Sequence, residues 1–131
     1  VFMFTGRGGA SYLVDAVCGF AYPALEWALY VGVPSARDMG VSVMAIGNSH
    51  HCGALSIHVE KIAQAGLIGI MVANTPKAIA PWGAKEAYFG TNPIAFSAPR
   101  EGADPLVMDL SLSRVARLMR MATRRRMQTQ P

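Results

Sequence analysis

The chain has 131 residues, of which 52% are hydrophobic and 15% charged, so it is long and apolar enough for one domain with its own core. Its longest apolar run, residues 67–73, is far shorter than the roughly 20 residues that a membrane span needs, and we expect no membrane segment. Cys18 and Cys52 come without a secretory signal, which indicates free thiols and a cytoplasmic location.

The net charge of +4 is unevenly distributed along the chain. Residues 1–113 carry six Lys or Arg against eight Asp or Glu, whereas residues 114–131 carry six arginines and no acidic residue. The body is therefore mildly acidic and has no nucleic-acid signature of its own. A binding module whose basic tail contacts nucleic acid or another anionic surface remains the rival interpretation.

The chain opens with a glycine-rich segment, in which "GRGG" at 6–9 could suggest nucleotide binding. It lacks the G-x-G-x-x-G pattern and no strand is expected before it, so we interpret it as a flexible turn. Residues 21–40 then predict a helix, with apolar side chains at helical spacing and a stop at Gly40. Pro34 lies inside that pattern and predicts either a kink or two short helices.

A strand, a helix and a second strand are predicted next. Residues 41–46 are rich in β-formers and run into the turn "GNS", and residues 52–66 have an apolar helical face that includes Leu55 and Val59. The continuous apolar run at 67–74 is typical of a strand covered on both faces. Together these segments predict one strand–helix–strand unit.

Prolines and glycines interrupt residues 76–93, which predicts a long structured loop that serves a site. Trp82 and Tyr88 in this loop could be stacking platforms, although aromatic residues more often belong to a core. Residues 94–99 and 106–111 then predict two short strands joined by a polar turn.

Adjacent histidines, His50 and His51, follow the predicted strand at the mouth of a turn, where a ring nitrogen can be presented to a ligand. The alternative from the residues alone is that one histidine is solvated and the other caps the helix or satisfies a buried carbonyl. A metal site formed by His51, Cys52 and His58 is a further alternative, if His51 and His58 share a helical face. Their spacing is poor for zinc, so we expect no metal.

Four segments in unbroken order resemble the malate/L-lactate dehydrogenase family of nicotinamide-dependent 2-hydroxyacid oxidoreductases, which also includes ureidoglycolate dehydrogenases, sulfolactate dehydrogenases and imine reductases. The segments are "NSHHCGA", "AGLIGIMVANTPKAIAPWG", "GTNPIAFSAP" and "LVMDLSLSRVAR". The resemblance implies an α/β, non-Rossmann cofactor-binding domain with a mixed to largely antiparallel sheet flanked by helices. It also implies a homodimer that uses NAD or NADP on a small 2-hydroxyacid or 2-oxoacid.

The same resemblance matches His51 with the family's catalytic histidine, the proton donor and acceptor at the substrate oxygen. An imidazole suits both directions of proton transfer near neutral pH. The family's cofactor contacts match Asn74, Thr75 and the segment Asp109, Leu110 and Ser111. From the residues alone, Thr75 is equally explained as a turn residue and Asp109 as a helix N-cap.

The resemblance divides the chain into a cofactor-binding domain, residues 1–117, and a basic tail, residues 118–131, that falls outside the family pattern. We expect the tail to be disordered or a frayed helix, and a reading-frame shift in the gene is the simplest source for it. Family members are longer at both ends. The chain is therefore expected to be a truncated fragment with little or no turnover, and a non-catalytic remnant is the other alternative.

Overall fold

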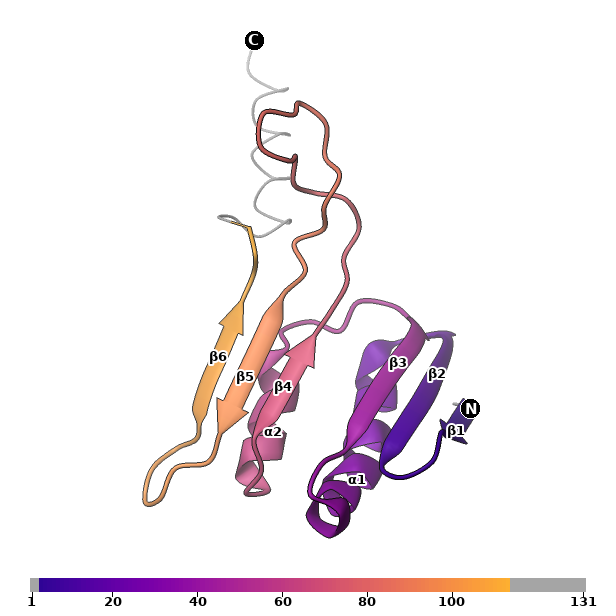
Figure 1. Ribbon diagram of the computed structural model, residues 1–131, viewed down its shortest axis with the longest axis vertical. Helices are drawn as coiled ribbons and strands as arrows, with labels where there is room; N and C mark the ends of the chain where they lie inside the picture. Colours follow the sequence, from indigo (N-terminus) through magenta and orange to yellow (C-terminus); the bar gives the residue numbers. More distant parts are fainter. Residues whose placement is uncertain (1–2, 114–131) are drawn as a thin grey trace.

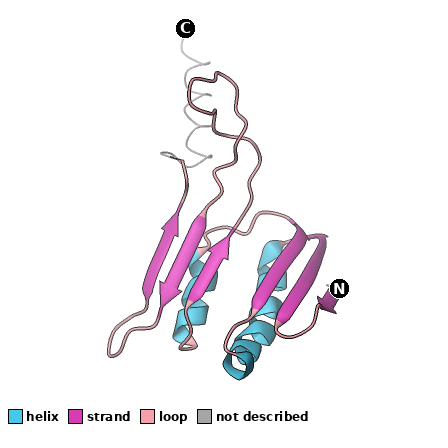
Figure 2. Cartoon of the chain, viewed as in Figure 1, coloured by secondary structure: helices cyan, strands magenta, loops and turns pink. Residues whose placement is uncertain are grey.

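A computed structural model of the chain describes residues 3–113 as two small sheets lying side by side, each with one helix on one face (Figure 1, Figure 2). This agrees with the predicted α/β class with mixed to largely antiparallel sheets. The first sheet has the strand order β1-β2-β3 and the second β4-β5-β6. The elements are β1 (Met3–Gly6), β2 (Ser11–Gly19), α1 (Ala21–Met39), β3 (Val43–Ser49), α2 (Ser56–Gln64), β4 (Gly69–Val72), β5 (Ile94–Ala98) and β6 (Leu106–Leu110).

The first sheet begins with a hairpin that the sequence pattern did not predict. β1 pairs antiparallel with β2, and the turn between them contains Gly8 and Gly9 at φ 95° and 58°, a backbone region that side chains with a Cβ disfavour. The expectation that no strand precedes "GRGG" is therefore wrong. These glycines shape a hairpin turn, and nothing in their setting resembles a dinucleotide-binding turn.

The parallel strand–helix–strand unit lies one strand earlier than predicted. β2 and β3 pair in parallel, and α1 is the crossover between them. β3 and β4, the strands of the predicted unit, belong to different sheets because β4 pairs antiparallel with β5, with Gly69 opposite Ser97. The strand, helix and strand predicted over residues 41–74 all form, but the prediction that they make one unit is wrong for this reason.

Helix α1 runs unbroken past Pro34, so the alternative of two short helices is wrong. Hydroxyl groups supply extra hydrogen bonds near the proline. Ser35 Oγ donates to the carbonyl of Val31 at 3.0 Å, and Ser42 Oγ donates to that of Gly32 at 2.7 Å. The inner face of α1 packs small side chains against the first sheet, and the buried members of this cluster are Val14, Ala16, Ala24 and Ala28.

Helix α2 covers one face of the second sheet and leaves the other face open. Leu55 and Val59 pack on Ala95, and the buried Ser97 hydroxyl donates to the Val59 carbonyl at 2.5 Å. On the open face the apolar side chains are exposed: Ile70, Val72, Ile94, Met108 and Leu110. Within residues 3–113, residues 67–74 are thus not covered on both faces, because one helix, α2, packs on this sheet.

Residues 76–93 form the predicted long loop, which contains only an isolated bridge between Ile79 and Phe89 and extends beyond the strand ends (Figure 1). Trp82 and Tyr88 are exposed, so the core interpretation of these aromatic residues is wrong. The two short strands predicted after the loop are confirmed as β5 and β6.

Within the described part of the chain, neither helix combines the length and apolar character required to cross a membrane. Cys18 and Cys52 are both free thiols. The predicted tail, residues 118–131, lies outside the described residues.

Candidate functional site

The two histidines lie at the junction of the two sheets. β3 ends at Ser49, and residues 50–55, which we call the junction segment, lead from the first sheet to α2. The His50 N–H donates to the Gly19 carbonyl at 2.9 Å, which ties the start of the segment to the end of β2. Both rings are exposed. The structure therefore places His51 where the turn pattern predicted, accessible to a ligand.

The end of β2 beside the junction segment has an unusual backbone. Val17 and Cys18 have φ values of 51° and 54°, in the left-handed region that β-branched residues rarely adopt. The register between β2 and β3 shifts here, and the carboxylate of Asp15 accepts from the Val17 N–H at 2.8 Å and from Asn48 Nδ2 at 3.1 Å. Strain of this kind concentrates at functional sites, where surrounding contacts maintain it.

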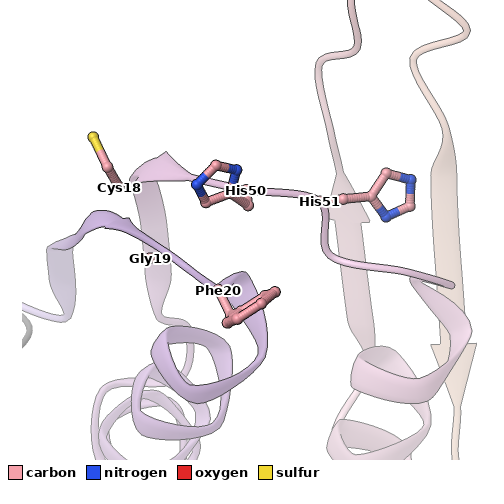
Figure 3. A pocket seen from close by; sticks show the side chains of 5 residues that line it. All are labelled: Cys18, Gly19, Phe20, His50 and His51. Carbon is pink, nitrogen blue, oxygen red and sulfur yellow. The ribbon is translucent and has the colours of Figure 1, made fainter.

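This bulge and the junction segment enclose an open hollow of about 440 Å³ (Figure 3). The ring of His50 lies 6.4 Å from that of Phe20, centroid to centroid, on one side of the hollow. In Figure 3 the His51 ring points away from Phe20, toward the strands of the second sheet. The lining residues are Cys18, Gly19, Phe20, His50 and His51.

The His51 ring is held by its own backbone. Its Nδ1 atom accepts a hydrogen bond from the Gly53 N–H at 2.8 Å. A ring nitrogen that accepts carries no proton, so in the neutral ring the proton is on Nε2. The side chain therefore presents an N–H to the solvent side, where it can donate a hydrogen bond to a substrate oxygen.

Asp109, at the end of β6, caps the N-terminus of α2. Its Oδ2 atom accepts from the Ser56 N–H at 2.9 Å, while Oδ1 has no hydrogen bond among the described residues. The interpretation of Asp109 as a cap of the helix expected after it concerns residues that lie largely outside the described ones, whereas the structure shows Asp109 capping α2, 53 residues away. Burial raises the pKa of the Cys52 thiol, and the charge of Asp109 raises it further. Asp109 is thus close to the junction segment.

Thr75 closes the base of the long loop. Its hydroxyl oxygen accepts from the Thr91 N–H at 2.7 Å and lies 3.0 Å from Thr91 Oγ1, and its own N–H donates to Asn92 Oδ1 at 3.1 Å. These bonds cross the loop rather than returning to the local backbone, so Thr75 is more than a turn residue. The neighbouring Asn74 is exposed.

The other two predicted contact residues, Leu110 and Ser111, follow Asp109 at the end of the second sheet. Leu110 lies on the open face, opposite to Asp109, because successive strand residues alternate between faces. Ser111 Oγ lies 2.8 Å from Ser113 Oγ. Asp109 thus contacts the N-terminus of α2, His51 lies in the junction segment that leads to this helix, and Leu110 lies on the other side of the sheet.

The metal alternative does not fit the helix that forms. His51 precedes α2, whereas His58 lies within it and is 1% exposed, so the two do not share a helical face. The described residues contain no group of three side chains arranged to hold a metal ion.

Tyr22 and His58 support the junction segment. The sequence pattern did not predict this role for either residue. His58 is buried in α2, and its Nε2 lies 3.2 Å from the Cys52 carbonyl oxygen. The Tyr22 ring packs at 5.3 Å from the His58 ring. A signal for His58 existed, because it stands three residues after Leu55 and therefore on the apolar face of the predicted helix.

Comparison with known proteins places the chain in a defined family. The model of the malate/L-lactate dehydrogenase family matches residues 2–131. The chain is 50% identical over 109 residues to a (2R)-3-sulfolactate dehydrogenase (NADP(+)) of Chromohalobacter salexigens, covering 83% of this chain and 33% of that protein. It is 34% identical over 110 residues to a ureidoglycolate dehydrogenase (NAD(+)) of Escherichia coli O157:H7, covering 84% and 32%.

Among solved structures, the crystal structure of the delta1-piperideine-2-carboxylate reductase from Pseudomonas syringae pvar. tomato is similar to this chain, with a TM-score of 0.78 and 40% identity. The superposition covers 95% of this chain and 38% of that one. The chain thus spans about a third of the length of the relatives that it matches, at 33%, 32% and 38%.

Proposed function

The chain belongs to the malate/L-lactate dehydrogenase family, and on that premise we propose that it forms the proton-transfer part of a nicotinamide-dependent oxidoreductase acting on small 2-hydroxyacids or 2-oxoacids. The observation that supports this most is the His51 ring, which is exposed at the junction of the two sheets and bonded through Nδ1 to the Gly53 N–H. That bond leaves the Nε2–H free for a substrate.

In the proposed reduction, His51 takes up a second proton from solvent on Nδ1, in place of the Gly53 hydrogen bond, and then donates its Nε2 proton to the substrate carbonyl oxygen, which becomes a hydroxyl. In the reverse direction, the neutral ring with its proton on Nδ1 accepts the hydroxyl proton on Nε2, and the Nδ1 proton returns to solvent. A bound nicotinamide supplies or takes the hydride at the carbon atom. We place the substrate in the adjacent hollow, which Phe20 and His51 both line.

The described residues fit a nicotinamide cofactor at the N-terminus of α2. Asp109 keeps its Oδ1 atom without a hydrogen bond there, and a carboxylate oxygen accepts from ribose hydroxyls. We assign the cofactor contacts to Asp109 with Leu110 and Ser111, and to Asn74 with Thr75 at the loop base. The relatives are named for NADP(+) and for NAD(+), so both forms are candidates here.

Binding and turnover are tested separately, because the chain spans only part of its relatives. NADH and NADPH are titrated by calorimetry, and their oxidation is then followed with pyruvate, oxaloacetate, glyoxylate and a cyclic imine carboxylate. We expect one dinucleotide to bind and His51→Asn to lower kcat by about 100-fold or more, with unchanged cofactor affinity.

Two comparisons make this result specific. His50→Asn removes the neighbouring ring and is expected to lower kcat far less than His51→Asn, because His50 contacts Phe20 rather than the Gly53 N–H. Glu60→Gln alters an exposed side chain of α2 away from the junction segment and serves as the control. Undiminished turnover in His51→Asn would refute the assignment.

We also propose that the chain acts as a cytoplasmic homodimer. Two free thiols support the location, and the exposed apolar rows of the second sheet support the assembly, since Ile70 and Val72 are 69% and 68% exposed. Sedimentation velocity tests the dimer. Ile70→Lys is expected to shift the chain toward the monomer, and a monomeric unmodified chain at high concentration would contradict the proposal.

A further inference from the structure

We propose that His58 is a positioning residue for His51, acting through the Cys52–Gly53 peptide group. The inference rests on the proposed role of His51 in proton transfer and adds a second residue to that role. His58 touches neither the hollow nor the exposed face of His51. Its effect is to hold the one peptide group that selects the tautomer of the His51 ring.

The two histidines bind opposite ends of the same peptide group. His58 Nε2 lies 3.2 Å from the Cys52 carbonyl oxygen, and the Gly53 N–H lies 2.8 Å from His51 Nδ1. The carbonyl and the N–H belong to one planar unit, so fixing its oxygen also fixes the direction of its N–H. A hydrogen bond accepted by the carbonyl further polarises the N–H and strengthens its donation.

The direction of the first hydrogen bond follows from the chemistry of its partner. A carbonyl oxygen only accepts, so His58 must donate from Nε2. In the neutral ring this leaves Nδ1 without a proton, and that atom is buried without a hydrogen-bond partner among the described residues. Both histidines therefore carry their proton on Nε2, one facing the peptide and the other facing solvent.

The unpaired Nδ1 argues against His58 as a space-filling residue. A buried acceptor without a partner is destabilising, and an apolar side chain of similar size at the same place avoids that penalty. His58 is 1% exposed and packs on the Tyr22 ring at 5.3 Å, an environment that suits an apolar residue equally well. The distinguishing contribution of the imidazole is the Nε2–H that it offers to Cys52.

Packing around Gly53 restricts the peptide group further. Gly53 has φ +68°, and a Cβ built on it would lie 1.7 Å from the Tyr22 hydroxyl oxygen. Tyr22 comes from α1 and His58 from α2, so the peptide group is held between the two helices that cover the two sheets. The position of the His51 ring thus depends on contacts from both halves of the molecule.

The test compares two variants of the full chain that have similar shape but differ in the hydrogen-bond donor. His58→Gln places an amide N–H near the Nε2 position, and His58→Met has a similar length without a donor. In ¹⁵N-histidine-labelled protein, the two ring nitrogen shifts of His51 report its tautomer, after assignment with His50→Asn. We expect His58→Met to lower the ratio of Nε2–H to Nδ1–H forms of His51 by about tenfold, and His58→Gln to preserve it.

The steady-state kinetics of the same variants provide a second measurement. Where the unmodified chain turns over, His58→Met is expected to lower kcat by about tenfold at nearly constant KM, and His58→Gln to restore most of it. An unchanged His51 tautomer in a folded His58→Met variant would overturn the inference. The nitrogen shifts need no substrate, so they decide the role of His58 even if His51→Asn were to refute the proton-transfer assignment.

A measurement on the unmodified chain covers the case in which His58→Met does not fold. Scalar couplings across hydrogen bonds are expected between the Gly53 nitrogen and His51 Nδ1, and between His58 Nε2 and the Cys52 carbonyl carbon. Detection of both couplings supports the inference. A His58 ring that instead carries its proton on Nδ1 would overturn it.

Discussion

The two sheets hold their parts of the site by different means. The first sheet and α1 have a core of small aliphatic side chains, and their contribution to the hollow is a strained backbone at Val17 and Cys18. The second sheet and α2 bury polar groups, and the buried ones are His58, Thr91 and Ser97. The comparison teaches that one half positions the junction segment by main-chain shape and the other by side-chain hydrogen bonds.

The largest effect is expected where the two halves meet, at Gly53. In Gly53→Ala the new Cβ would lie 1.7 Å from the Tyr22 hydroxyl, at a φ of +68°. We expect a loss of about 3 kcal/mol in the free energy of unfolding, measured with urea. Gly47→Ala is the control, because nothing lies within 4 Å of its Cβ position.

Tyr22→Phe sharpens that test, because it removes the hydroxyl that the new Cβ would meet. The cost of Gly53→Ala is expected to be smaller in the Tyr22→Phe background, since the Tyr22 Cζ contact at 2.8 Å remains but the hydroxyl contact does not. Additive effects of the two substitutions would mean that the helices do not clamp this peptide group.

In the second sheet, a smaller loss of unfolding free energy is expected from a substitution at Asp109. Asp109→Ala removes the acceptor of the Ser56 N–H at the N-terminus of α2 and is expected to cost about 1 kcal/mol of unfolding free energy. Asp104→Ala, an exposed carboxylate in the β5–β6 turn, is expected to cost far less. Equal losses of unfolding free energy in the two variants would mean that the Asp109 carboxylate does not stabilise the N-terminus of α2.

In the first sheet, a substitution to glycine at the strained bulge is expected to raise the unfolding free energy rather than lower it. Val17 has φ 51°, so Val17→Gly relieves strain and is expected to raise the unfolding free energy by about 0.5 kcal/mol. Val43→Gly, at an equally exposed position of β3, is expected to lower it by about 1 kcal/mol. If both glycines destabilise alike, the bulge stores no strain.

The smallest effect concerns the two thiols. Burial raises the pKa of Cys52, with a contribution from Asp109, so the folded chain holds this proton to higher pH than the unfolded chain. Stability is therefore expected to fall as pH rises through the ordinary thiol range, because only the unfolded thiol ionises there. Iodoacetamide labelling followed by mass spectrometry should modify the exposed Cys18 before Cys52. Faster labelling of Cys52 than of Cys18 at pH 8 would contradict the raised pKa of Cys52.

The loop, the strands β5 and β6, the core of α2 and the exposed histidine pair could all be predicted from the sequence. Each depends on a local signal: prolines and glycines at 76–93, apolar spacing at Leu55 and Val59, or a turn directly after a strand. The family resemblance added the assignment of His51, and the structure places that ring in an accessible position.

The rest was decided by contacts between segments distant in sequence. Nothing local distinguishes a strand that pairs with β2 from one that pairs with β5, so the division into two sheets emerges only with the backbone hydrogen bonds. In the same way, Asp109 caps a helix 53 residues away, and Tyr22 and His58 meet only when α1 and α2 pack around the junction segment. The sequence by itself indicated which residues carry the proposed chemistry. The tertiary structure decided which of them are oriented for it, because hydrogen bonds and close contacts depend on positions in space rather than on spacing along the chain.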